Sequence, residues 1–462
     1  MNKFITLVLC VITSSVFGQE KSKLSDYNIA SFYTPEEAKA NAFSEVPVSF
    51  STLSYHDIND TYTNIDDLKW LQPVARENKV VMIGETHYSR VTSNLRNRIF
   101  FALNTYDYFP LIIIESAYSF TEFTNYFIHL SDDVKAREFF HQELSKLVDT
   151  EEDSIFYEQL RQWNQTHPDK PVTIGATDLE WGWDDMLTYI LQPYLYGLEG
   201  VSKTKVDEVI DLGQSDAFFE AIKPLMDQAR AQNLVGKYPF IHPDYISNVI
   251  TNFQSTHYAL SLSIDYYRYQ AITRNLTDDR FYGSFIREQK AVLHGGGNHM
   301  TSRFQYPMGG NFMAEGSYLN HDFQPTKGKT YSLMIKTMSY ELDAMSERNL
   351  EDCMRQGVQY RKMVTRMRNA FDQGILQKDQ PYFIFYQRND LEKLMVELSY
   401  QHPQQAFRIL AHSWDRLQEQ ANVSSPELSN IIDRAHNTAK KYDEYIFVPA
   451  SPLVVARWKA GE

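Results

Sequence analysis

The sequence predicts an α/β fold with a largely parallel central sheet flanked by helices. Two observations carry this prediction. Short apolar runs rich in β-branched residues alternate with longer helical patterns, and runs such as VVMIG and LIIIE are apolar over four successive positions. Strands that are apolar on both faces need helices on both sides of the sheet. A helical pattern between these two runs completes a βαβ unit, which is typical of parallel sheets.

The expected elements follow from these patterns in chain order. The helix between the first two strands covers Arg90 to Tyr106, where apolar residues recur every four positions from Val91 to Leu103. Arg96 and Arg98 are expected on the solvated face of this helix. The expected strands cover residues 79–83, 111–114, 172–175, 291–293, 331–336, 382–386 and 445–448.

Residues 181–290 interrupt this alternation with helical patterns only. Apolar residues at helical spacing from Ile246 to Tyr267 predict one long amphipathic helix in this segment. We interpret the segment as a helical cap over the carboxyl ends of the strands. Residues 341–437 are expected to mix helices with one strand.

The amino-terminal residues have the pattern of a secretory signal peptide over residues 1–18. Lys3 gives a positive start, residues 4–12 are apolar, and Ser15 and Gly18 are small residues near the expected cleavage site. An exported chain, periplasmic or secreted, is therefore expected. A polar, irregular extension over residues 19–60 and the α/β domain over residues 61–462 would follow. Cys353 is the only cysteine beyond the signal peptide, so no disulfide within the chain is expected.

The charge balance restricts the classes of partner. Lys and Arg number 45 and Asp and Glu number 59, which gives a formal net charge of -14. A nucleic-acid backbone or an anionic membrane needs a basic surface, so neither is an expected partner. No other run approaches the roughly 20 apolar residues of a membrane-spanning helix. The expected partner is a small-molecule or peptide substrate.

Polar side chains follow four of the expected strands. The first strand ends in GETH (84–87), the second in ES (115–116) and the third in TDLE (177–180), and the fourth runs into HGGGNH (294–299). The carboxyl ends of parallel strands meet at one edge of a sheet, where functional groups collect. His87, His299, Glu85 and Glu115 are therefore expected to lie together.

Two kinds of site would use two imidazoles and two carboxylates. One holds a divalent metal through nitrogen and oxygen ligands, with His87, His299, Glu85 and Glu115 as the ligand set. The other is a metal-free hydrolytic site, in which a carboxylate orients a histidine that acts as general base on water. The residues leave both alternatives open, so no cofactor is certain. A GxSxG elbow, a GxGxxG fingerprint and a Walker pattern after a strand are all lacking, which disfavours serine-type and nucleotide-binding sites.

These motifs resemble the erythromycin esterase-like family. The segment IGETHYSR, followed by a helix and LIIIESA, is similar to the opening of that family. The resemblance continues in ATDLEW, NLTDDRFYGSFI, KAVLHGGGNHM, PMGGNFMAEG and DEYIFVPASPLV, so that it extends from residue 80 to residue 454. The wider superfamily includes the ChaN-type haem-binding lipoproteins and the TraB and Tiki proteins.

The resemblance implies a hydrolase that cleaves an ester, lactone or amide bond. It implies that His87 is the general base, that Glu85 and Glu115 are its acidic partners and that His299 is the second active-site histidine. The glycine run before His299 differs from the Ala-His-Asn-x-His segment of the esterases and is closer to the TraB and Tiki proteins, where metal-dependent peptide hydrolysis is the implied activity. The alternative, by resemblance to ChaN-type proteins, is a protein that binds haem, iron or another metal without catalysis.

Four further residues are candidates for substrate binding. Arg90 either binds a substrate oxygen or pairs with an acid on the first helix. Asp178 either belongs to the site or caps a helix. Asn298 would orient a ligand or donate to an oxyanion. His294 stands earlier than the esterase pattern would place it, which leaves its role open.

Overall fold

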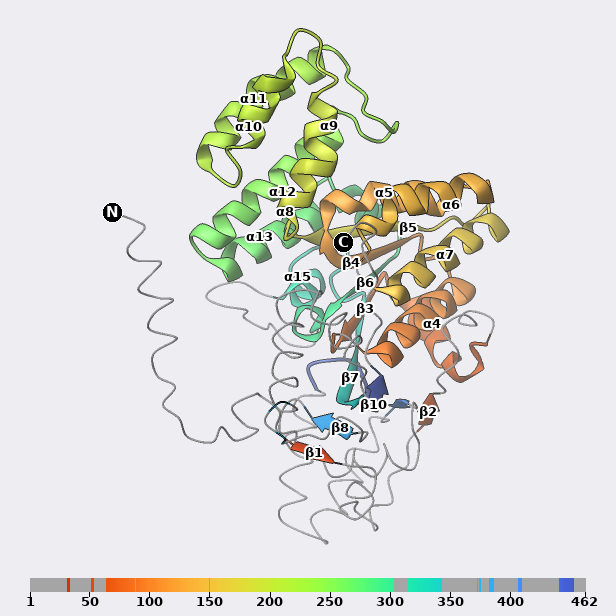
Figure 1. Ribbon diagram of the computed structural model, residues 1–462. Coiled ribbons are helices and arrows are strands. Elements are labelled where there is room, and N and C mark those ends of the chain that lie inside the picture. The colour runs from red at the N-terminus through yellow and green to blue at the C-terminus, as the bar shows by residue number, and fades with distance from the viewer. Residues whose placement is uncertain are drawn as a thin grey trace, which may run out of the picture.

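The structure is a computed structural model that describes residues 31–33, 51–53, 64–87, 89–148, 150–302, 314–342, 372, 374, 382–385, 406–408 and 440–452. These residues contain a ten-stranded sheet, of which six neighbouring strands are all parallel in the order β10-β7-β3-β6-β4-β5. Helices flank this sheet (Figure 1). The predicted α/β class with a largely parallel sheet is confirmed.

Each of the seven expected strands is present in the described residues. Three short strands, of three residues each, lie at positions where no strand was expected, because such a length gives no readable pattern. Two of them, β1 and β2, pair antiparallel with β8 and β9, so that residues 19–60 are not wholly irregular. The strands are β1 (Ser31–Tyr33), β2 (Ser51–Leu53), β3 (Val80–Glu85), β4 (Leu111–Ala117), β5 (Thr173–Asp178), β6 (Ala291–Gly296), β7 (Thr330–Leu342), β8 (Tyr382–Phe385), β9 (Ala406–Arg408) and β10 (Glu444–Pro452).

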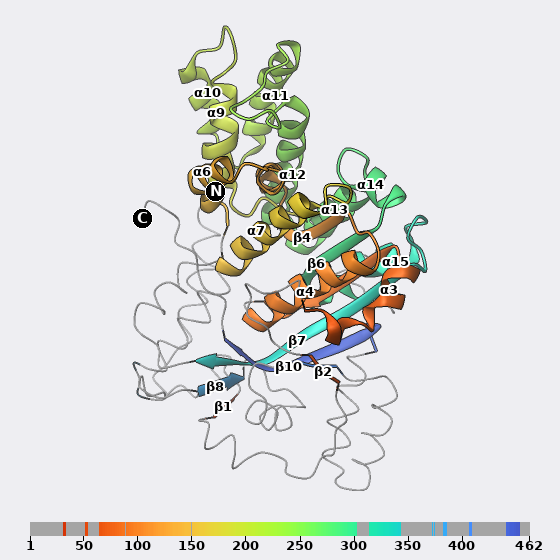
Figure 2. The same cartoon turned by 90° about the vertical axis from the view of Figure 1, so that its right-hand side faces the viewer.

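The apolar runs are covered on both faces, as the sequence predicts. Val81 and Ile83 of β3 join the core that also contains the apolar stripe of α4, whereas Val80 and Met82 join a second core on the other face. Successive side chains of a strand point to opposite faces, so an uninterrupted apolar run fills two cores. Figure 2 shows α3, α4 and α7 in front of the sheet.

A side-chain hydrogen bond fixes the start of helix α4. Helix α4 has the expected bounds, and its Ser89 N-cap accepts a hydrogen bond from the backbone N–H of Thr92 at 3.1 Å. The helices outside the cap are α3 (Leu71–Glu77), α4 (Arg90–Tyr106), α5 (Thr121–Ile128), α6 (Asp133–Gln142), α7 (Glu151–Thr166) and α15 (Glu315–His321), with short 3-10 turns at Asp66–Leu68, Tyr118–Phe120, Leu144–Lys146 and Gly297–Met300.

The prediction that Arg96 and Arg98 of α4 face solvent is wrong. Both are buried, with exposed fractions of 5% and 0%. Arg98 donates to Asp67 at 2.5 Å, and Arg96 donates to Asp153 at 3.1 Å. Each buried guanidinium therefore has a carboxylate partner from another element, which a helical pattern alone does not reveal.

Between β5 and β6 the chain forms helices only, as expected for a cap. The prediction of one long helix up to Tyr267 is wrong, because the backbone leaves helical geometry at Leu262 and Ser263 and starts a second helix. The cap helices are α8 (Trp183–Asp185), a π-helical turn (Met186–Leu191), α9 (Gln192–Leu195), α10 (Lys203–Ile210), α11 (Asp216–Ala231), α12 (Pro243–Ser261), α13 (Ile264–Thr277) and α14 (Gly283–Glu288).

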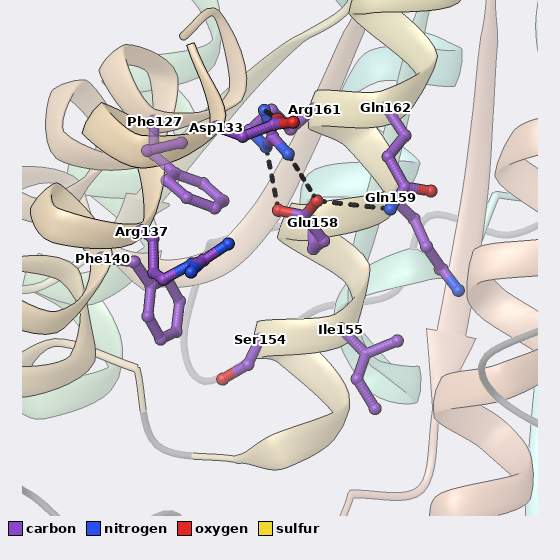
Figure 3. Close-up of a pocket in the computed structure, with 11 residues that line it drawn as sticks. Phe127, Asp133, Arg137, Phe140, Ser154, Ile155, Glu158, Gln159, Arg161 and Gln162 are labelled. Carbon is purple, nitrogen blue, oxygen red and sulfur yellow. Dashed lines mark hydrogen bonds and ion pairs between the residues drawn. The ribbon is translucent and has the colours of Figure 1, made fainter. Parts of the chain in front are cut away.

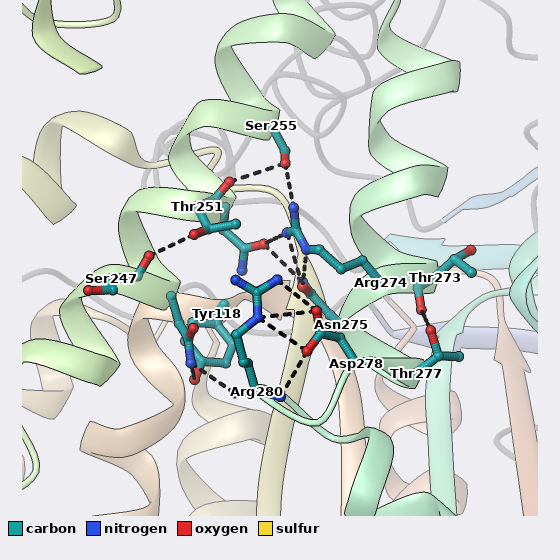
Figure 4. Close-up of polar contacts among 12 residues, drawn as sticks. Tyr118, Ser247, Thr251, Ser255, Thr273, Arg274, Asn275, Thr277, Asp278 and Arg280 are labelled. Atoms are coloured by element: carbon teal, nitrogen blue, oxygen red, sulfur yellow. Dashed lines mark hydrogen bonds and ion pairs between the residues drawn. The ribbon is translucent and has the colours of Figure 1, made fainter. Parts of the chain in front are cut away.

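Polar contacts hold α12, α13 and the sheet together (Figure 4). Arg274 of α13 donates to Ser255 of α12 at 2.9 Å and also to Asn252. Asn275 donates to the backbone carbonyl of Thr177, in β5, at 2.9 Å. Helix α13 is thereby fixed beside the carboxyl end of β5, while α9, α10 and α11 lie farther from the sheet (Figure 1).

No helix in the described part of the chain has the length and the apolar character needed to cross a membrane. The predicted signal peptide over residues 1–18 lies outside the described residues and stays a prediction. The boundaries assigned to the domains and to the cap also stay predictions.

Candidate active site

The carboxyl ends of β3, β4, β5 and β6 place the candidate residues at one edge of the sheet. Parallel pairing of β4 with β6 ends at Ile114 and His294, and the register between β4 and β5 shifts between Ile114 and Ala117. Such an irregularity is common beside active sites, where it re-aims a side chain. Here it lies at Glu115, whose carboxylate reaches Gly296, the last residue of β6.

Glu85 binds two of the three imidazoles in the site. Its Oε1 lies 2.9 Å from Nδ1 of His87, and its Oε2 lies 2.8 Å from Nε2 of His294. The side chain of His294 is 6% exposed, whereas the side chain of His87 is 43% exposed. Glu85 therefore connects a buried histidine to one that a substrate can reach.

Glu115 lies among positive and polar groups. It accepts a hydrogen bond from the backbone N–H of Gly296 at 2.5 Å and another from Arg268 of α13. Nε2 of His299 lies 3.5 Å from its Oε1. Arg268 also donates to both oxygens of Asp178 at 2.8 Å, so that it joins the carboxylates at the ends of β4 and β5.

Glu315 holds the third imidazole. Nδ1 of His299 lies 3.0 Å from both carboxylate oxygens of Glu315, the first residue of α15. Glu315 is 2% exposed, and the ring of Tyr269 lies 5.4 Å from the ring of His299. The imidazole is thus held by a buried carboxylate on one nitrogen and faces Glu115 with the other.

The two glycines at the end of β6 leave the space in which these side chains meet. A Cβ atom at Gly296 would lie 3.2 Å from Nε2 of His87 and 3.3 Å from the Oε2 of Glu115. The same atom would lie 3.4 Å from a ring carbon of His299. A Cβ atom at Gly295 would approach Glu115 to 2.8 Å, closer than such atoms come. The two Gly-x-x-His segments therefore converge on one point, where a larger residue would displace the catalytic candidates.

The charges of the site shift the pKa values of its residues. Burial alone would lower the pKa of His87, but the hydrogen bond and negative charge of Glu85 outweigh burial and raise it to about 9. The pKa of His299 also rises to about 9, because Glu315 outweighs the opposite effect of burial. Burial would raise the pKa of Glu115, yet the positive charges of His299, His87 and Arg268 lower it to about 2. The pKa of Glu85 lies well below its usual range, because His294 and His87 outweigh burial.

The interior of the site is small. A cavity of about 20 Å³ is lined by Glu115, Thr177, His294, His299, Glu315 and apolar residues of the sheet and of α13. This volume is enough for about one water molecule. Since the carboxylates are buried and His87 is half-exposed, a substrate would approach from the side of His87.

The four candidates for substrate binding lie in different surroundings. Arg90 forms an ion pair at 3.2 Å with Glu152, which is on α7 and not on the first helix. Asp178 joins the site through Arg268, and its Oδ1 also accepts from the N–H of Leu179. Asn298 is exposed, whereas His294 belongs to the buried network of Glu85.

Two residues of this network were not found by sequence reasoning. Arg268 lies in the middle of a cap helix and Glu315 begins a short helix, and neither follows a strand. They reach the site only because segments that are distant in the sequence pack against each other in the fold. His294, an imidazole inside an otherwise apolar strand, signals a buried polar partner, but that partner is Glu85 and not Arg268 or Glu315.

The candidate metal ligands do not fit a metal ion as they are arranged. The described residues contain no group of three or more His, Cys, Asp or Glu side chains placed to hold one. Nδ1 of His87 and Nδ1 of His299 each face a carboxylate at 2.9 to 3.0 Å, and a guanidinium contacts Glu115. The reaction that these residues support therefore uses none of them as a metal ligand.

A larger groove lies elsewhere, between α5, α6 and α7. It has a volume of about 650 Å³ and contains none of the candidate residues (Figure 3). Its charged groups are largely engaged with one another, since Arg161 pairs with Asp133 at 2.9 Å and with Glu158 at 2.8 Å.

Comparisons with known proteins give distant structural matches alone. No protein-family model matches the chain, and no curated protein matches it. A Bacillus cereus protein of known structure is similar over 67% of this chain and 76% of its own, with 15% identity and a TM-score of 0.44. A succinoglycan biosynthesis protein is similar over 95% and 100%, with 11% identity and a TM-score of 0.49. A mutant of the erythromycin esterase EreC in its open conformation is similar over 65% and 80%, with 11% identity and a TM-score of 0.40. At these values the matches assign neither a family nor an activity, and the resemblance read from the motifs stays a prediction.

Proposed function

We propose that this chain is a hydrolase that cleaves an ester, lactone or amide bond with water activated at His87. The observation that carries the proposal is the position of Glu85, which holds Nδ1 of a half-exposed His87 and turns the other ring nitrogen toward Gly296. A carboxylate that orients an imidazole toward a reacting atom is the arrangement of a general base. On the sequence pattern of residues 1–18, we also propose that the chain acts outside the cytoplasm.

In the proposed reaction the neutral imidazole of His87 takes a proton from water as the water oxygen attacks the carbonyl carbon. The electron pair of the carbonyl moves to its oxygen, and the positive charge of His299 stabilises this oxyanion. Collapse of the intermediate breaks the bond to the leaving group, which receives the proton from His87. The products are a carboxylic acid and an alcohol or amine, so that one water is consumed.

The raised pKa of His87 predicts how the activity depends on pH. With a pKa of about 9, the imidazole is largely protonated at neutral pH, and the basic form increases as pH rises. The activity is therefore expected to rise tenfold per pH unit below about 9 and to fall again above it, because His299, whose pKa is also about 9, then loses the charge that stabilises the oxyanion. A pH profile of kcat/KM measures this.

The first test compares His87→Ala with the wild type on a panel of esters, lactones and amides. Loss of the base is expected to lower kcat/KM by about 100-fold or more. The matched control is His257→Ala, because His257 is also paired with a carboxylate, Asp216, but lies in the cap. Full activity of His87→Ala would contradict the proposal. Capture of haem or metal instead predicts a Soret band or stoichiometric metal in the purified chain, with no turnover.

A further inference from the structure

Exposed apolar side chains gather where α12 turns into α13, the helix whose Arg268 contacts Glu115 of the proposed active site. Among the described residues, nine large apolar side chains are exposed, and four of these lie within residues 260–266, where α12 turns into α13. A fifth, Trp181, follows β5. We call the five residues the apolar corner: Trp181, Leu260, Leu262, Ile264 and Tyr266. Single exposed apolar residues are normal, but a gathering of them marks a binding surface.

Trp181 is held in place by residues of the site. Its indole N–H donates to Oδ2 of Asp178 at 2.9 Å, and the guanidinium of Arg268 lies 5.7 Å from the centre of its ring. Arg268 is at the same time bound to Glu115. Trp181 is 43% exposed although two side chains hold its ring. Such a preorganised aromatic surface loses little conformational freedom when it binds a ligand.

Ile264 of the apolar corner lies near the arginine that contacts Trp181. Ile264 lies four residues before Arg268 in α13, so that both lie on the same face of the helix. Leu179 packs with Ala259 of α12 and Ala271 of α13, which places the segment before Trp181 against these two helices. Trp181 and Ile264 therefore lie beside Arg268, which binds Glu115 and Asp178.

We propose that Trp181 and Ile264 bind an apolar acyl or aromatic group of the substrate, an inference that rests on the proposed hydrolase function. The charges of the site support this class of substrate. Arg268 is matched by two carboxylates, Glu115 and Asp178, so its charge is not available to attract an anionic group. The substrate class is a neutral ester, lactone or amide with an apolar chain or ring next to the scissile bond.

The test measures kcat/KM for p-nitrophenyl octanoate and p-nitrophenyl acetate. We expect the wild type to prefer the octanoate, and Trp181→Ala and Ile264→Ser to lower the ratio of octanoate to acetate by about tenfold, mainly through KM. Trp181→Phe is expected to restore most of the ratio. The matched control is Tyr189→Ala, because Tyr189 is an exposed cap aromatic with Lys146 5.7 Å from its ring, and its loss leaves both esters unaffected.

Binding of N-methyloctanamide, an amide that carries the octanoyl group, separates this proposal from the proposed function. A wild type that hydrolyses neither ester contradicts the hydrolase, but amide binding that is lost in Trp181→Ala still supports the apolar corner as a binding surface. Equal kcat/KM values for the two esters in the wild type, or an unchanged ratio in Trp181→Ala, overturn the inference while the hydrolase stands.

Discussion

At the scale of single residues, the chemistry of the site depends on carboxylates that each hold an imidazole. His87 and Glu85 were predicted together because they follow one strand within two residues of each other. His299 was predicted from the glycine run, but its partner Glu315 lies 16 residues further along the chain in another element. Two interacting residues that are close in the sequence can be recognised from their spacing. Two residues that only tertiary packing brings together leave no local pattern.

Glu85→Gln tests whether the carboxylate sets the basicity of His87. The amide keeps the shape but removes the negative charge, so the pKa of His87 is expected to fall from about 9 toward its ordinary 6.5. The rise of kcat/KM with pH would then level off at a lower pH, and the maximal kcat would fall by about 100-fold. A pH profile of both constants measures this. Asp216→Asn removes the carboxylate of the His257 pair and serves as control. An unchanged profile in Glu85→Gln would contradict the role given to Glu85.

At the scale of elements, α13 is the part of the cap that completes the site. The apolar pattern continued through Leu262 and Ser263 and so predicted one helix, but a break of two residues lets α13 lie over the ends of β4 and β5. The helical spacing of the apolar residues gives no sign of this break, since neither Leu262 nor Ser263 is glycine or proline. The position of Arg268 follows from this break and was therefore missed with it.

Arg268→Met tests the contact between α13 and the sheet. The methionine keeps much of the volume but leaves Glu115 and Asp178 buried without their shared cation, so the free energy of unfolding is expected to fall by about 3 kcal/mol. Urea unfolding measures this loss. Arg280→Met is the control, since Arg280 is an exposed arginine paired with Asp278, and such surface pairs contribute about 0 to 1 kcal/mol. Equal losses of unfolding free energy in both variants would show that Arg268 contributes no more to stability than a surface ion pair does.

At the scale of the whole molecule, the sheet could be predicted and much of its surroundings could not. Short runs in which apolar residues predominate predicted each strand of the parallel sheet, because a strand buried on both faces has few polar positions to obscure the run. The antiparallel strands β1, β2 and β9 have three residues each, too few for a pattern. The buried charges, among them Arg98 and Glu180, depend on partners from other elements and have no signature in the local sequence.

These buried charges predict how the stability of the folded chain depends on pH. Burial raises the pKa of Glu180 from 4.5 to about 8, although its hydrogen bonds from Ser119 act in the opposite direction. A raised pKa stabilises the fold fully below pH 4.5 and no longer does so once pH has risen through 8. His299, raised from 6.5 to about 9, acts in the same sense at higher pH. Glu115, lowered from 4.5 to about 2, stabilises above pH 4.5 and loses this effect as pH falls through 2.

The stability should therefore be greatest near pH 4.5 and fall by several kcal/mol toward pH 9, since one pKa unit corresponds to about 1.4 kcal/mol. Thermal unfolding between pH 3 and pH 9 measures this profile. In Glu180→Gln, whose amide keeps a hydrogen-bond acceptor for Ser119 but does not titrate, the decline between pH 5 and pH 8 should become shallower. Glu208→Gln, a change at an exposed carboxylate, should retain the full decline. If the two variants gave the same slope, the buried carboxyl of Glu180 would not be the group that limits stability at alkaline pH.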